Sequence, residues 1–279
     1  MRLSAITGQH QQLTILGLDQ PLMLAEQMGI VLENDAGRAQ LESALLEIVA
    51  AYTPLVTGVL LSPELGYAAI PKISSGAGLL FCLEKTLTES DPLSIPILQN
   101  NWNIEYVRNN YAMAKLALFA RSDEAELITK LELVNELYDS CRYEGIDYML
   151  EILVTDGRRL GTEAFQEQQL RLIRLFRQQS DIAALEYPRT ALGCLTATAQ
   201  LGAPWIMVES EKTEYSEAKE ELRNALAGGA LGLLIRNSVF PSFKRGEFSM
   251  EGLRSYLKQE GRDRLLELAR ICEESVGVG

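Results

Sequence analysis

Eight short apolar runs, each bounded by turn residues, dominate the sequence and alternate with longer segments whose apolar residues recur at helical spacing. Strands that alternate with helices in this way are typical of parallel βαβ units. Eight such units in a chain of 279 residues predict a single-domain α/β protein, a (βα)8 TIM barrel. The predicted strands are residues 13–18, 56–61, 77–83, 112–119, 148–154, 182–187, 205–208 and 230–235.

Helical periodicity predicts five long helices, the last of them C-terminal. They cover residues 36–51, 124–142, 163–177, 216–227 and 250–274, with 249–275 as the C-terminal helical region and 1–12 as a polar leader. Asp123 and Glu126 have the spacing of a capping box at the start of the second helix. A doubly wound open sheet is the rival fold, but no Gly-x-Gly-x-x-Gly sequence follows the first predicted strand.

The charge balance limits the classes of partner. Lys and Arg number 26 against 38 Asp and Glu, which gives a formal net charge of −12. Binding to nucleic acid or to anionic lipid needs the opposite charge, so we expect neither partner. No apolar run approaches the roughly 18 residues that span a bilayer. We therefore expect a cytoplasmic protein.

Histidine and cysteine usage argues against metal chemistry. His10 is the only histidine, and Cys82, Cys141, Cys194 and Cys272 are widely spaced along the chain. Zinc sites use clustered Cys and His ligands, so we expect no metal site and four reduced, mostly buried thiols. A catalytic triad that needs a histidine in the body of the fold is excluded as well.

Charged residues lie within or directly after most of the predicted strands. Strands of a parallel barrel are buried on both faces, so these side chains point to the barrel axis near its C-terminal end or form ion pairs. The first reading predicts a ligand site, and the second an ion-pair layer that fills the barrel. The residues are Asp19, Glu84, Lys85, Lys115, Glu151, Glu186, Glu209, Glu211 and Arg236.

An ordered set of short strings carries a resemblance to a known family. The strings are LDQ at 18–20, LLSPELG at 60–66, AGLLFCLEKT at 77–86, LEIL at 150–153 and LEYP at 185–188. The chain resembles the tagatose-1,6-bisphosphate aldolase family of class I aldolases, which includes the sulfofructose-phosphate aldolases. The resemblance implies a barrel that cleaves ketose phosphates through a lysine Schiff base, without a metal or other cofactor.

The resemblance assigns catalytic positions one by one. Asp19 matches the family's first-strand aspartate, Lys115 the lysine of its fourth strand and Glu151 the acid of its fifth strand. The sixth strand departs from the family pattern L-K-V-E-x-P, in which the lysine forms the imine. Glu186 and Pro188 are retained there, but Ala184 stands where the family has the lysine.

The predicted substrate-binding residues are Arg236, Ser210, Glu84 and Lys85. In the family, a Ser-x-Gly turn after the seventh strand and a Gly-Arg pair after the eighth hold a phosphate. This chain has Glu209-Ser210-Glu211 and Ile235-Arg236 at these places, and carboxylates there would repel a phosphate dianion. A pair between Glu211 and Arg236, which would fill the anion site from within the protein, is the alternative.

Two functions follow from these departures. The first is an aldolase-type barrel that has lost Schiff-base chemistry and acts as a ligand-binding, regulatory or assembly protein. In it, nearby carboxylates keep Lys115 charged. The alternative is an active carbon–carbon lyase on a small carbonyl or sugar substrate, with Lys115 as imine former, Glu151 as general acid–base and Asp19 orienting the amine. A small carbonyl or sugar ligand, a homo-oligomer and a protein partner all remain open.

Overall fold

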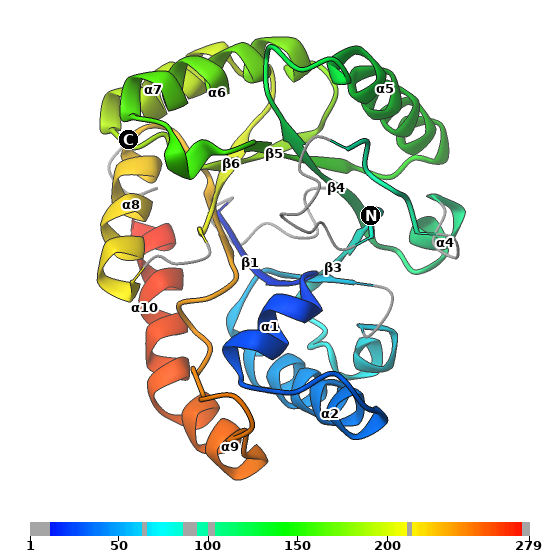
Figure 1. Cartoon of the computed structure of the whole chain (residues 1–279), viewed down its shortest axis with the longest axis vertical. Coiled ribbons are helices and arrows are strands. Elements are labelled where there is room, and N and C mark those ends of the chain that lie inside the picture. Colours follow the sequence, from blue (N-terminus) through cyan, green and yellow to red (C-terminus); the bar gives the residue numbers. More distant parts are fainter. Residues whose placement is uncertain (1–11, 63–65, 86–93, 100–103, 211–213, 275–279) are drawn as a thin grey trace.

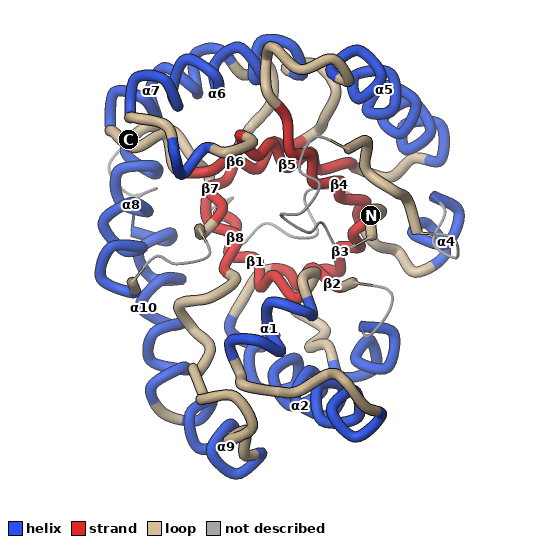
Figure 2. Tube along the Cα trace, viewed as in Figure 1, coloured by secondary structure: helices blue, strands red, loops and turns tan. Residues whose placement is uncertain are grey.

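Eight parallel strands close into one barrel in sequence order, β1 to β8, which confirms the predicted fold class (Figures 1 and 2). The computed structural model describes residues 12–62, 66–85, 94–99, 104–210 and 214–274. The predicted polar leader lies almost wholly outside these residues. The strands are β1 (Leu13–Leu18), β2 (Gly58–Leu61), β3 (Gly78–Cys82), β4 (Met113–Ala120), β5 (Tyr148–Val154), β6 (Ile182–Glu186), β7 (Trp205–Val208) and β8 (Gly232–Ile235).

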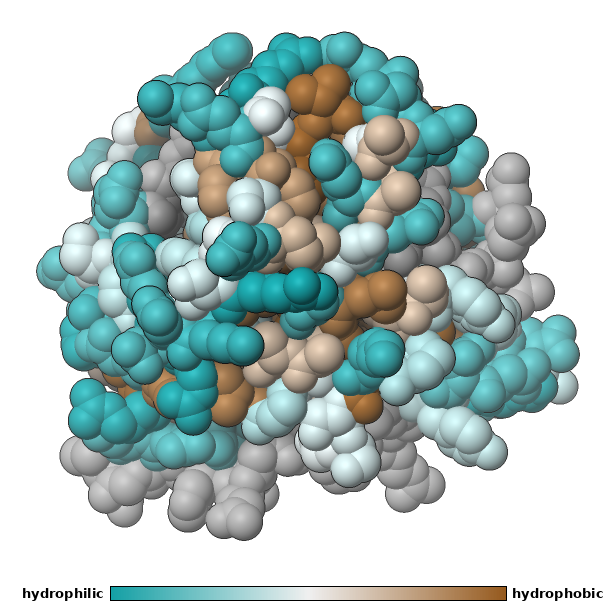
Figure 3. Space-filling view, turned by 90° about the horizontal axis from the view of Figure 1, so that it is seen from below, coloured by the Kyte–Doolittle hydropathy of each residue, from teal (hydrophilic) through white to brown (hydrophobic). Residues whose placement is uncertain are grey.

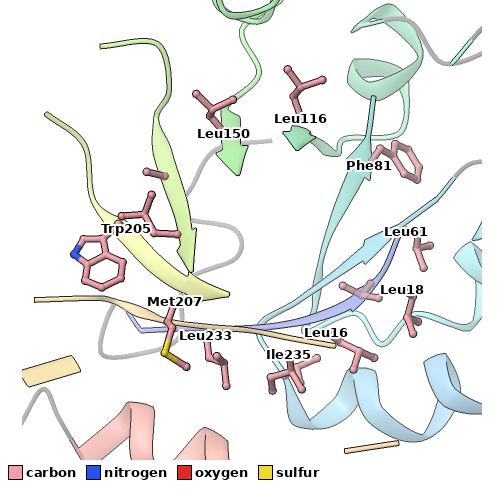
Figure 4. Packing of buried hydrophobic residues seen from close by; sticks show 14 of the residues in the cluster. Leu16, Leu18, Leu61, Phe81, Leu116, Leu150, Trp205, Met207, Leu233 and Ile235 are labelled. Carbon is pink, nitrogen blue, oxygen red and sulfur yellow. The ribbon is translucent and has the colours of Figure 1, made fainter. Parts of the chain in front are cut away.

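Alternation along each strand divides the core into two parts. One set of strand side chains, which includes Leu16, Phe81 and Trp205, points outward to the helices (Figure 4). The other set points to the barrel axis and packs into a smaller apolar cluster that includes Ile15, Met149 and Ala184. This inner cluster fills the N-terminal part of the barrel, so a polar site has room only towards its C-terminal end.

Helices surround the barrel on its outside (Figure 2). Four of the five predicted helices are confirmed within three residues at each end, whereas α1, α4 and α7 are additional to the prediction. The helices are α1 (Pro21–Gln27), α2 (Asp35–Tyr52), α4 (Ile104–Asn109), α5 (Leu127–Glu144), α6 (Thr162–Phe176), α7 (Ala191–Gln200), α8 (Tyr215–Ala227), α9 (Met250–Lys258) and α10 (Glu260–Glu274), with the short 3-10 segments η2 (Thr53–Leu55), η3 (Tyr67–Lys72) and η4 (Gly157–Arg159).

The predicted capping box at the start of α5 is wrong. The helix begins at Leu127, and its N-cap residue Glu126 makes no side-chain cap hydrogen bond. Asp123 instead pairs with the Arg121 guanidinium at 3.0 Å, and the Glu124 carboxylate accepts the backbone N–H of Arg121 at 2.9 Å. The acidic residues therefore order the turn before the helix.

The single C-terminal helix expected from the sequence is two helices, α9 and α10, which meet at Gln259 (φ −120°, ψ −105°). The break changes the direction of the chain while the apolar stripe of both helices stays buried. Leu253, Leu257, Leu265 and Leu268 are at most 3% exposed, so the stripe is core packing and not an assembly surface. On the face of the molecule seen in Figure 3, the described residues form hydrophilic areas interrupted by apolar patches.

All four cysteines lie within the described residues and are buried, and no disulfide joins them. Burial raises the pKa of Cys141 to about 12 and that of Cys194 to about 11, so these thiols stay protonated and weakly nucleophilic. Across the part of the chain that the structure describes, none of the helices has the length and apolar character needed to cross a membrane.

Candidate functional site

Lys115 lies at the centre of a polar layer inside the barrel. Alternation along β4 turns Met113 and Lys115 to the axis, and the Lys115 side chain is completely buried. Its Nζ lies 2.8 Å from Asp19 Oδ2 and 2.6 Å from Glu84 Oε1. A third carboxylate oxygen, Glu151 Oε2, lies 2.8 Å from the same Nζ. Three carboxylates therefore surround one ammonium group.

Arg236 is the second cation of this layer. Its Nη2 donates to Asp19 Oδ2 and to Glu151 Oε2, each at 2.8 Å. Its Nη1 donates to Glu151 Oε1, and the two nitrogens thus bind this carboxylate in bidentate fashion. We call Asp19, Glu84, Lys115, Glu151 and Arg236 the ion-pair cluster. Asp19, Glu84 and Arg236 follow their strands, and Lys115 and Glu151 lie within theirs, as the sequence predicts.

Gly17 makes the placement of Arg236 possible. A Cβ atom at Gly17 would lie 2.8 Å from Arg236 Cγ and 3.2 Å from the Ile235 carbonyl oxygen. The aliphatic stem of the arginine passes over this glycine because β1 and β8 are neighbours in the barrel. The sequence analysis missed Gly17, although a glycine within an otherwise apolar strand is a known signal of close approach.

The electrostatics of the cluster stabilise its charged forms. Burial alone lowers the pKa of Lys115, but Asp19, Glu151 and Glu84 together raise it well above its ordinary value. Burial raises the pKa of the Asp19 and Glu151 carboxyls, but Arg236 and Lys115 outweigh it and hold both below their ordinary values. The three carboxylates thus favour the protonated form of the Lys115 amine, and a protonated amine is not a nucleophile.

Glu84 differs from the other two carboxyls of the cluster. Burial raises its pKa against the opposing effect of Lys115. Its Oε2 atom is buried without a hydrogen-bond partner among the described residues. Three carboxyls face two cations, and Glu84 is therefore the carboxyl that takes up a proton most readily.

A strap formed by residues 97–99 extends the sheet beyond β3. The Lys85 N–H donates to the Ile97 carbonyl, and the Gln99 N–H donates to the Leu83 carbonyl, both at 2.8 Å. Lys85 is half-buried and does not belong to the described residues that line the cavity below. Lys85 thus belongs neither to the ion-pair cluster nor to the described lining of that cavity.

A cavity of about 210 Å³ opens at the C-terminal ends of β4 to β8. We call it the mouth cavity. Arg236 is the one member of the ion-pair cluster that also lines it, so the cluster lies deeper in the barrel. The predicted residues Glu186 and Ser210 lie on its wall. Its lining comprises Gln20, Phe119, Leu153, Val154, Asp156, Gly157, Arg158, Arg159, Glu186, Val208, Glu209, Ser210 and Arg236.

The loop after β5 forms one side of this cavity and is held in place by Arg189. The Arg189 guanidinium donates to the carbonyl oxygens of Gly157 and Leu160, each at 2.6 Å, and stacks over the Phe165 ring. Asp156 and Arg159 pair within the loop at 3.1 Å. The loop therefore presents charged residues to the cavity from a fixed backbone.

Glu186 ends β6 and brings a titratable carboxyl to the cavity wall. Burial raises its pKa to about 7, although its Oε2 accepts the Val154 N–H at 2.8 Å. A carboxyl with a pKa near neutrality can both give and take a proton at working pH. Ala184, two residues earlier, is buried in the inner apolar cluster and pairs in register with Glu151.

Glu209 turns inward at the end of β7. Its carboxylate accepts the backbone N–H groups of Arg236 and Asn237 at 2.8 Å and of Ser238 at 2.9 Å. Glu209 is one of the two acids that the sequence led us to expect at the rim of the barrel. It is 2% exposed, and its carboxylate is bound to the chain after β8. Glu211, the other acid and the predicted partner of Arg236, lies outside the described residues.

Among the described residues, no three His, Cys, Asp or Glu side chains are arranged to hold a metal ion. The cations of the site are Lys115, Arg158, Arg159 and Arg236, all supplied by the chain itself.

Sequence comparison finds no matching family model, but it finds curated relatives of one kind. Tagatose 1,6-diphosphate aldolase 1 of Enterococcus faecalis is 30% identical over 146 residues, which cover 51% of this chain and 44% of that protein. The enzyme of the same name from Streptococcus mutans is 26% identical over 155 residues, 54% of this chain and 48% of that protein. The chain is a divergent relative of the tagatose 1,6-diphosphate aldolases. Its match spans about half the length of these relatives.

Solved structures agree on the fold. A crystal structure of an archaeal fructose 1,6-bisphosphate aldolase has a TM-score of 0.68 at 14% identity, over 96% of each chain. A Schiff-base-forming fructose-1,6-bisphosphate aldolase has a TM-score of 0.67 over the same shares. Both likenesses show a (βα)8 barrel and confirm the predicted fold class.

Proposed function

We propose that this aldolase-type barrel binds a small, uncharged sugar or carbonyl compound in the mouth cavity and forms no Schiff base with it. The observation that carries the proposal is the burial of the Lys115 Nζ among three carboxylates within 2.8 Å. The carboxylates keep this amine protonated, and a protonated amine does not attack a carbonyl carbon. The amine also does not line the cavity, so a carbonyl carbon bound there would not contact it. The position of the family's imine-forming lysine holds Ala184.

The charges of the cavity support an uncharged ligand. Asp156 pairs with Arg159, Arg236 pairs with Asp19 and Glu151, and Glu209 is satisfied by backbone N–H groups. Hydroxyl groups of a ligand can bond to Gln20, whose buried Oε1 has no hydrogen-bond partner among the described residues. The proposed binding needs no metal ion or organic cofactor, fits a cytoplasmic protein, and is compatible with self-assembly or a protein partner.

Borohydride trapping tests the proposal. The protein is incubated with dihydroxyacetone or dihydroxyacetone phosphate, reduced with borohydride, and its intact mass is measured. We expect no mass gain, while the Schiff-base-forming fructose-1,6-bisphosphate aldolase, treated in parallel, should gain the reduced adduct. Binding of dihydroxyacetone is followed separately by the amide resonances of Val154 and Ser210, which should shift to saturation. A stable adduct mapped to Lys115 would contradict the proposal and support the active lyase.

A second candidate function is proton transfer without a covalent intermediate, and Glu186 favours it. A carboxyl with a pKa of about 7 on the cavity wall can remove a proton from the carbon beside a bound carbonyl. The electron pair then moves to the carbonyl oxygen and gives an enediolate, and the Glu186 carboxyl returns a proton to the carbon after it has exchanged its proton with solvent. In D2O this cycle replaces hydrogen of dihydroxyacetone by deuterium, which proton NMR detects. The exchange should disappear in Glu186→Gln and persist in Lys115→Met.

A further inference from the structure

The backbone after β8 forms a pocket of N–H groups that already holds an anion. Three consecutive amides, those of Arg236, Asn237 and Ser238, donate to the two carboxylate oxygens of Glu209 at 2.8 to 2.9 Å. Successive backbone N–H groups that converge on one point form an anion-binding concavity. In (βα)8 barrels, phosphate sites are often formed by the loops after strands 7 and 8. Glu209 and its three donors lie in these two loops.

The geometry leaves no room for a second anion at the same donors. Each carboxylate oxygen of Glu209 already takes one or two of the three N–H groups, and the side chain is 2% exposed. Glu209 also lines the mouth cavity. A phosphoryl group at this edge of the cavity would meet the carboxylate and would lose the donors. Two unit charges 4 Å apart repel by about 1 kcal/mol even at the dielectric of water, and by more when buried.

We propose that Glu209 is a specificity-determining residue: its carboxylate occupies the phosphate position of the barrel, so the ligand of the mouth cavity carries no phosphoryl group at that end. The inference rests on the proposed function and deepens it by naming the residue that excludes a phosphoryl group from the sugar or small carbonyl ligand. It also explains how the acid after β7 is compatible with a buried position. The negative charge belongs to the protein, where the related enzymes would receive it from their substrate.

The test uses inorganic phosphate as the probe and Glu209→Ala as the variant. Phosphate is titrated into the full-length protein while the amide resonances of Arg236, Asn237 and Ser238 are followed by NMR. We expect no saturable shift in the wild type and saturable binding at these amides in Glu209→Ala, tighter by at least about tenfold, or about 1.4 kcal/mol. Glu214→Ala is the matched control, because it removes the same charge from an exposed position, the N-cap residue of α8. It should bind phosphate as weakly as the wild type.

Two results would overturn the inference. One is saturable phosphate binding to these amides in the wild type with the affinity of Glu209→Ala, which would mean that the carboxylate moves aside. The other is the absence of binding in the variant, which would mean that the amides do not form an anion site. If Glu209→Ala does not fold, Glu209→Ser, whose short side chain also leaves the three N–H groups free, should still bind phosphate more tightly than the wild type. Detection of a Schiff base would contradict the proposed function but would leave these phosphate titrations unchanged. The two experiments therefore test the proposed function and this inference separately.

Discussion

The Glu151 carboxylate lies 2.8 Å from the Lys115 ammonium, and both side chains are completely buried inside the barrel. Removal of charges from water costs several kcal/mol per ion, and only close partners offset this cost. The cluster offsets it collectively, because Asp19 and Glu151 each contact both cations. Loss of one member leaves buried charges unbalanced, and the stability of the fold therefore reports on the charge state of Lys115.

Lys115→Met should destabilise the protein by about 3 to 5 kcal/mol, because three buried carboxylates would then face Arg236 alone. Urea unfolding at neutral pH measures the change. Lys72→Met, at an exposed position, is the control and should stay within about 0.5 kcal/mol of the wild type. Addition of Glu84→Gln to Lys115→Met should recover part of the loss, since one uncompensated carboxylate is removed. A loss no larger than that of the control would mean that Lys115 is neutral in the folded protein.

Gly17→Ala should destabilise the protein by about 1 to 3 kcal/mol, because the new methyl group would overlap the Arg236 side chain. Gly76→Ala is the control, since a Cβ at Gly76 meets no atom within 4 Å. In an Arg236→Ala background the same Gly17→Ala change should cost much less, and urea unfolding of the four proteins gives the coupling energy. An unchanged cost in that background would assign the strain to the backbone of β8.

The fold and most of the candidate site follow from sequence patterns with simple physical causes. Alternation in β4 and β5 turns Lys115 and Glu151 to the axis, and closure of the barrel brings them together with Asp19 and Arg236. The strands are parallel and packed against helices on the outside, so a charged side chain that must avoid the outer apolar layer can point only to the barrel axis. The prediction of a charged, ion-paired Lys115 depends only on this proximity.

The position of Glu209 and the division of the C-terminal helix were not predicted, because they depend on the course of the backbone outside the regular strands and helices. Glu209 could equally have faced solvent, and only the course of the chain through Arg236, Asn237 and Ser238 gives its carboxylate three donors. Strand alternation stops at Val208 and says nothing about the next residue. The division of the C-terminal helix at Gln259 has a similar origin, because the apolar stripe continues across the break.

Asp19→Asn should change the response of the protein to acid. Burial raises the pKa of Asp19, but Arg236 and Lys115 hold it below its ordinary value, so the ionised group stabilises the fold above about pH 4 and this contribution is lost as the pH falls. The variant should therefore be less stable than the wild type at pH 7, and the difference should narrow towards pH 3. Urea unfolding at both pH values measures it, with the exposed Asp139→Asn as reference. A difference that widens in acid would contradict the ion pairing.

Glu186→Gln should change the pH dependence of stability in the opposite direction from Asp19→Asn. Burial raises the pKa of Glu186 from 4.5 to about 7, so between these values the folded state binds more protons than the unfolded state. The free energy of unfolding of the wild type should therefore fall by an amount on the order of 1 to 3 kcal/mol as the pH rises through this range. Gln does not ionise, so the variant should not show this fall.

The stability of Glu186→Gln relative to the wild type should thus increase from pH 5 to pH 8 in urea unfolding. The amide oxygen of Gln can still accept the Val154 N–H, so the difference reports ionisation and not a lost hydrogen bond. Glu163→Gln, at an exposed position in α6, supplies the reference curve.

Glu151, Arg158 and Arg189 are the charged groups that influence Glu186, and Arg189→Met should raise its pKa further because a nearby positive charge is removed. A pH-independent difference for Glu186→Gln would show that this carboxyl is already ionised at pH 5, and it would remove the basis for proton transfer in the mouth cavity.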